Sequence, residues 1–96
     1  MHRVVIRINN NCNEFWEKYN GFYRRHDYDL VKHRIYDRNG YTVYESAMIV
    51  DGKRLVEKGY MREDTVEQLV IETEDKGLAD EITRIAHSTP CVDVST

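Results

Sequence analysis

This chain has little of what interrupts or crosslinks a small protein. Its 96 residues include one proline, five glycines and two cysteines. With so little proline and glycine the chain contains no linker or low-complexity segment, and we expect one domain over residues 1–96. Two cysteines are too few for a disulfide framework, so we expect two reduced thiols.

Long apolar runs are also missing. No stretch approaches the roughly 20 apolar residues that a membrane-spanning helix needs. The first eight residues hold a short apolar run interrupted by Arg7, which is typical of a strand and not of a signal peptide. We therefore expect a cytoplasmic protein that has no membrane partner.

Positive charge is scarce in the second half of the chain. Residues 1–44 contain eight Lys or Arg and five Asp or Glu, whereas residues 45–96 contain six and twelve. Such asymmetry can steer a charged partner toward one part of the surface, although an acidic surface also keeps a protein soluble.

The strongest local pattern is a β-hairpin over residues 28–50. Two alternating runs, 28–38 and 41–50, flank Asn39-Gly40, and this dipeptide is the strongest short-range hairpin signal. A strict alternation places aromatic and basic side chains on one face of the first strand. These side chains are Tyr28, Leu30, Lys32, Arg34 and Tyr36.

The remaining elements predict a small α+β domain. Asn11 and Glu14 form a capping box that indicates the start of a helix, and Asp75 indicates the N-cap of a second helix. Further strands are expected at residues 2–8, 53–62, 66–73 and 91–95. The expected architecture is an antiparallel sheet of four to six strands with two helices on one face. The nearest common topology is a ferredoxin-like split βαβ with an extended central meander, a fold that serves many unrelated functions.

This topology makes a prediction about the two cysteines. It places the first and last strands as antiparallel neighbours in the centre of the sheet. Cys12 follows the first strand and Cys91 begins the last one, so the two side chains are expected within reach of each other.

No motif for catalysis or metal binding can be found. A small metal-dependent or histidine-dependent enzyme would use His26, His33 or Cys12, but the spacing of the histidines matches no metal site. His33 is expected on the inward side of the hairpin. We therefore expect no enzyme, no catalytic residue, no metal and no cofactor.

Basic and aromatic residues together give one functional hypothesis. Lys or Arg can neutralise phosphates, and tyrosine rings can stack on unpaired bases, so single-stranded nucleic acid is a candidate ligand of the sheet face. Nearby aspartates and the acidic chain as a whole weigh against it. The candidate binding residues are Tyr28, Lys32, Arg34, Tyr36, Tyr44, Arg24 and Arg25.

The hypothesis that we place first is a non-enzymatic protein-binding module, such as a small inhibitor, adaptor or regulatory protein, of the kind found in phages and mobile elements. Tyrosine and arginine are enriched at interface hot spots, and the partner would be another protein or a second copy forming a dimer. Acidic residues could also imitate a nucleic-acid backbone toward a basic partner. These residues are Glu72, Glu74, Asp80 and Glu81.

Overall fold

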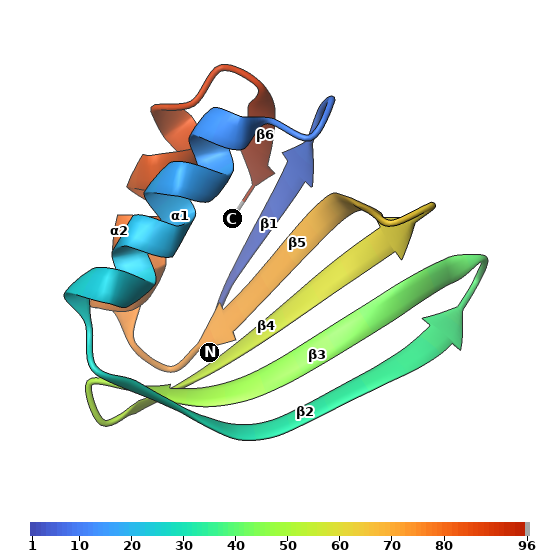
Figure 1. The fold of residues 1–96 in the computed structure, drawn as a ribbon. Helices are drawn as coiled ribbons and strands as arrows, with labels where there is room; N and C mark the ends of the chain where they lie inside the picture. The colour runs from blue at the N-terminus through green and yellow to red at the C-terminus, as the bar shows by residue number, and fades with distance from the viewer. Residues whose placement is uncertain (96) are drawn as a thin grey trace.

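The computed structural model describes residues 1–95, which form a six-stranded sheet and two helices (Figure 1). The elements follow one another along the chain as β1 (His2–Ile8), α1 (Asn13–Arg25), β2 (Tyr28–Arg38), β3 (Tyr41–Val50), β4 (Lys53–Arg62), β5 (Thr65–Thr73), α2 (Lys76–His87) and β6 (Val92–Ser95). Neither helix is of a length and apolar character that would let it span a membrane.

The sheet is antiparallel throughout, in the order β2-β3-β4-β5-β1-β6. Both helices lie on the same side of it (Figure 1), so the expected α+β architecture is confirmed. The ferredoxin-like arrangement is not confirmed, because β2 to β5 run as a four-stranded meander. The last strand does pair with the first, but it lies at an edge of the sheet and not in its centre.

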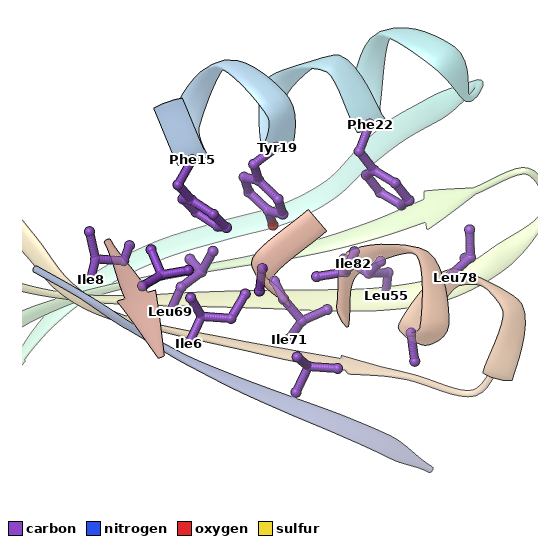
Figure 2. Close-up of a cluster of buried hydrophobic side chains, with 14 of the residues drawn as sticks. Ile6, Ile8, Phe15, Tyr19, Phe22, Leu55, Leu69, Ile71, Leu78 and Ile82 are labelled. Atoms are coloured by element: carbon purple, nitrogen blue, oxygen red, sulfur yellow. The ribbon is translucent and has the colours of Figure 1, made fainter. Parts of the chain in front are cut away.

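The core fills the layer between the sheet and the helices. Phe15, Tyr19 and Phe22 recur at helical spacing on the buried side of α1. Their rings point toward strand residues such as Ile6 and Ile71 (Figure 2). The sheet therefore has one face covered by helices, and we call the opposite side the open face.

The two helices begin in different ways. The carboxylate of Asp75 accepts a hydrogen bond from the backbone N–H of Leu78 at 2.9 Å, which confirms the predicted cap of α2. The capping box predicted for α1 is wrong, because the N-cap is Cys12 and no side chain caps this helix. Cys12 has a left-handed backbone with φ 37°, as do Asn10 and Asn11 before it.

A disulfide joins Cys12 to Cys91 across 79 residues, with their Cα atoms 5.7 Å apart. The predicted proximity of these cysteines is therefore confirmed. The expectation of two reduced thiols is wrong, because pairing of β1 with β6 brings both residues to the same end of the sheet.

Candidate functional site

A β-bulge divides the predicted aromatic and basic surface between the two faces of the sheet. The β2–β3 register shifts between Leu30 and Lys32, so the strict alternation expected from the sequence is broken at Val31. Tyr28 and Leu30 lie on the helix side. The other three predicted residues lie on the open face, where Lys32, Arg34 and Tyr36 are paired with Ala47, Glu45 and Val43 of β3. The prediction that all of them share one face is wrong.

The same bulge places His33 and Ile35 on the helix side of the sheet. His33 lies on the predicted side, but it is exposed, and its Nδ1 is 2.8 Å from the hydroxyl of Ser46. It is therefore not a core residue, and residues 1–95 contain no group of three or more His, Cys, Asp or Glu side chains that could hold a metal ion.

Strand β2 is exposed along almost its whole length. It lies at the edge of the sheet, and Figure 1 shows the β2–β3 hairpin extending away from both helices. Its large apolar side chains are more than half exposed: Tyr28 51%, Leu30 58%, Val31 65% and Ile35 64%. Within the described chain, Met1 is the only other exposed large apolar residue.

Ion pairs cross the open face. Arg34 binds Glu45 at 3.2 Å, and Lys58 binds Glu72 at 3.4 Å. Hydrogen bonding from Arg34 lowers the pKa of Glu45 below its usual value. The guanidinium of Arg34 also lies 4.8 Å from the centre of the Tyr36 ring, so this predicted pair of binding residues is in contact.

The other predicted binding residues lie elsewhere. Arg24 and Arg25 are at the C-terminal end of α1, and Arg25 pairs with Glu81 of α2 at 2.9 Å. Tyr44 lies on the helix side of β3, where it packs against the core. Basic residues of α1 and tyrosines of the sheet therefore do not form one continuous surface.

The predicted acidic surface is also divided. Glu72 pairs with Lys58 on the open face, whereas Asp80 and Glu81 belong to α2 on the other side of the sheet. Glu74 accepts the backbone N–H of Arg54 at 3.1 Å. These four carboxylates do not line up as a nucleic-acid backbone would.

A groove between α1 and the meander is the feature that sequence reasoning missed. Its volume is about 330 Å³, and aromatic side chains dominate it. We call it the aromatic groove. Helix α1 contributes Trp16, Tyr19, Asn20 and Tyr23, strands β2 and β3 contribute Tyr28, Leu30, Tyr44, Ser46 and Met48, and β4 contributes Glu57.

Glu57 is the only carboxylate among the described residues that line the aromatic groove. The hydroxyl groups of Tyr19 and Tyr23 both donate to its Oε2, the latter at 2.9 Å. Burial, and then the nearby Glu57 carboxylate, raise the pKa of Tyr19, Tyr23 and Tyr44 above that of a free tyrosine. These tyrosines therefore stay protonated and act as hydrogen-bond donors.

The position of Tyr44 depends on a glycine in the next strand. Tyr44 is paired with Gly59 of β4, and its ring occupies the space where a side chain of Gly59 would stand. A Cβ at residue 59 would come 2.0 Å from the Tyr44 ring. A glycine inside a strand pattern is the sequence signal for such a close approach.

His26, a candidate catalytic residue in the sequence, instead joins three elements. Its Nδ1 meets Asp51 in the β3–β4 turn, and its Nε2 is 3.0 Å from Glu81 of α2. Hydrogen bonding to Asp51 raises the pKa of His26, burial opposes this shift, and Glu81 adds to it. The same contact lowers the pKa of Asp51. Both ring nitrogens donate when His26 is protonated, so the cation is the form that stabilises this junction.

We expect the free energy of unfolding to fall as the pH rises through this histidine's titration. Because the pKa of His26 is raised in the folded state, its protonation stabilises the folded protein fully at pH values below the ordinary histidine pKa of about 6.5. This stabilisation is lost as the pH rises past the folded-state pKa. Urea denaturation between about pH 5.5 and 8.5 measures it. His26→Gln should remove most of the slope, and His87→Gln, at an exposed histidine of α2, should not. An unchanged slope in His26→Gln would contradict the assignment.

Comparison with known proteins places this chain in no group, because no family model, curated protein or solved structure matches it.

Proposed function

We propose that this chain is a non-enzymatic protein-binding module, of the inhibitor, adaptor or regulatory kind, to which the partner adds an extended segment along the free edge of β2. The observation that carries this proposal is the exposure of β2, an edge strand of 11 residues that is open on both faces. An exposed edge of this kind is a template for pairing with another chain.

The turn of the hairpin identifies which backbone groups are free. Asn39 and Gly40 both have positive φ, 53° and 83°, as a type I′ turn requires. In such a hairpin the flanking residues form a hydrogen-bonded pair, and the pattern alternates from there. The backbone groups of His33, Ile35 and Asp37 therefore point away from β3, toward a partner strand.

The usual protection of a sheet edge is only partial here. Edge strands are commonly guarded by proline, by charged side chains such as lysine, by a bulge or by shortness. Strand β2 has charged side chains and a bulge, but it is long and contains no proline. The bulge of β2 precedes Lys32, and the pairing with β3 is regular from there to Arg38. The opposite edge, β6, has four residues and offers a much shorter template.

Replacement of Ile35 by proline tests the edge directly. It removes one outward N–H and leaves the hydrogen bonds to β3 in place, because proline is tolerated on the solvent side of an edge strand. We expect capture of the partner from an extract of the source cells to fall about tenfold, the equivalent of 1.4 kcal/mol. Ile35→Thr, which keeps the N–H and the branched shape, should retain most of the binding.

Further variants separate the alternatives. Charge reversal at Glu72, Glu74, Asp80 and Glu81 should leave capture nearly unchanged, because these residues form no single surface. If charge reversal abolished capture and Ile35→Pro did not, imitation of nucleic acid would replace edge pairing as the mechanism. Thermal unfolding of each variant checks that a loss of partner capture does not result from a loss of folded structure.

The open face supports single-stranded nucleic acid as a second candidate ligand. Basic residues outnumber acidic ones there, and tyrosines stand among them, with the guanidinium of Arg62 4.4 Å from the centre of the Tyr41 ring. Filter binding to single-stranded DNA and RNA at two salt concentrations tests it, and absence of binding at low salt would exclude it. The basic and aromatic residues are Arg3, Arg7, Lys32, Arg34, Arg38, Arg54, Lys58, Arg62, Tyr36, Tyr41 and Tyr60.

A further inference from the structure

We propose that the aromatic groove receives the side chain of a lysine from the partner protein, with its ammonium group at Glu57 and its alkyl stem against the tyrosine and tryptophan rings. The assignment of this lysine to a partner protein rests on the proposed function. The existence of an ammonium site in the groove rests on the groove alone.

The rings form one continuous wall. Trp16, Tyr19 and Tyr23 follow one another along α1 at helical spacing, with ring centres 6.0 Å and then 5.1 Å apart. Tyr28 continues the wall from β2, with its ring centre 5.3 Å from that of Tyr23. The faces of aromatic rings attract cations, and rings arranged around a hollow are a known receptor for quaternary ammonium groups. Tyr19 contributes its hydroxyl group and not its ring face, because neighbouring phenylalanine rings stack on it.

The charge of the groove is negative and has no counter-ion. None of the residues that line it is basic, and Glu57 forms no ion pair with any lysine, arginine or histidine among residues 1–95. A partly buried carboxylate without a cationic partner is costly, because desolvation disfavours its charge. Hydroxyl donors offset part of this cost, and a bound cation would offset more.

An ammonium group suits Glu57 better than a guanidinium group. Oε2 already accepts hydrogen bonds from Tyr19 and Tyr23. A guanidinium binds a carboxylate best through two parallel hydrogen bonds to both oxygens, and this arrangement is obstructed here. A lysine ammonium is a compact charge that needs no such fork.

The position of the groove explains how a protein partner would reach it. Tyr28 and Leu30 line the groove and belong to β2, and both side chains are more than half exposed. A segment that pairs with the edge of β2 would carry every second side chain on the helix side of the sheet. One such side chain would lie beside Tyr28 and Leu30, at the mouth of the groove.

The site can be tested without the partner, using N-acetyl-lysine methylamide as the probe. The chain has one tryptophan, Trp16, so its indole N–H signal in NMR spectra reports the groove directly. We expect saturable shifts of Trp16 with a Kd in the millimolar range, which corresponds to about 4 kcal/mol. The norleucine analogue, which lacks the ammonium, should bind about tenfold more weakly.

Matched variants locate the charge. Glu57→Gln should weaken binding of the lysine probe about tenfold, whereas Glu45→Gln, the same change on the open face, should alter it less than twofold. If Glu57→Gln disturbs folding, Tyr28→Leu serves instead, because Tyr28 is 51% exposed and its loss removes one wall of the groove. We expect Tyr28→Leu to weaken binding several-fold.

Three results would overturn the proposal. Equal binding of the norleucine and lysine probes would show an apolar groove without a charge preference. Tighter binding of the arginine analogue would show a guanidinium site, and no shift of Trp16 up to about 50 mM probe would exclude the site altogether. Because no partner is used, these results do not depend on pairing along the β2 edge. Only the capture experiment would show that the proposed edge pairing is wrong.

Discussion

Replacing Cys12 and Cys91 together by alanine is expected to lower the free energy of unfolding by about 4 kcal/mol. The bond closes a loop of 79 residues, most of the chain, so its loss frees a large number of unfolded conformations. It also fixes the left-handed Cys12, which starts α1 without a side-chain cap. Urea denaturation of both proteins at one pH measures the difference.

Reduction of the wild-type protein provides the control. Dithiothreitol should destabilise the wild type by nearly the same amount and leave the double alanine variant unchanged. Equal stability of the oxidised wild type and the variant would contradict a stabilising role. A free-thiol assay on the native and the unfolded protein shows whether the bond is present.

The disulfide also bears on the cellular location. Disulfides persist mainly in oxidising compartments. The cytoplasmic location that we predicted from the absence of a signal-like segment would leave Cys12 and Cys91 reduced. Trapping of thiols in the source cells before lysis tests this prediction, and a fully oxidised pair would contradict it.

The hairpin shows which features this sequence can predict and which it cannot. Asn39-Gly40 predicts the turn correctly, because few dipeptides tolerate two positive φ angles in succession. The bulge at Val31 has no comparable signal, since an extra residue inside a strand leaves the local composition unchanged. One unpaired residue was enough to place Tyr28 and Leu30, which precede it, on the side opposite to the one predicted.

The aromatic groove could not be predicted for a different reason. Its wall and floor come from α1, β2, β3 and β4, which meet only when the meander folds under the helix. The helical spacing of Phe15, Tyr19 and Phe22 indicates a buried helix face, and all three residues are buried. This spacing cannot show that the hydroxyl of Tyr19 reaches Glu57, which is 38 residues away in the chain.

Replacement of Gly59 by alanine is expected to destabilise the protein by about 2–3 kcal/mol, which is typical of overpacking in a filled site. The new methyl group would stand 2.0 Å from a ring carbon of Tyr44. That ring is partly buried and packs against the core, so it cannot move aside freely. Gly21→Ala in α1 is the matched control, because only the flexible side chains of Arg24 and Arg25 lie near the added methyl group. It should stabilise the helix by about 0.5–1 kcal/mol.

A double-mutant cycle separates the clash from any other effect of the substitution. In a Tyr44→Ala background the obstructing ring is absent, so Gly59→Ala should cost little, and the coupling between the two substitutions should reach 1–3 kcal/mol or so. An equal loss of stability in both backgrounds would show that residue 59 needs glycine for its backbone and not for the ring. Because Tyr44 lines the aromatic groove, Gly59→Ala should also weaken binding of the lysine probe. Gly21→Ala should leave that binding unchanged, since Gly21 lies outside the groove lining.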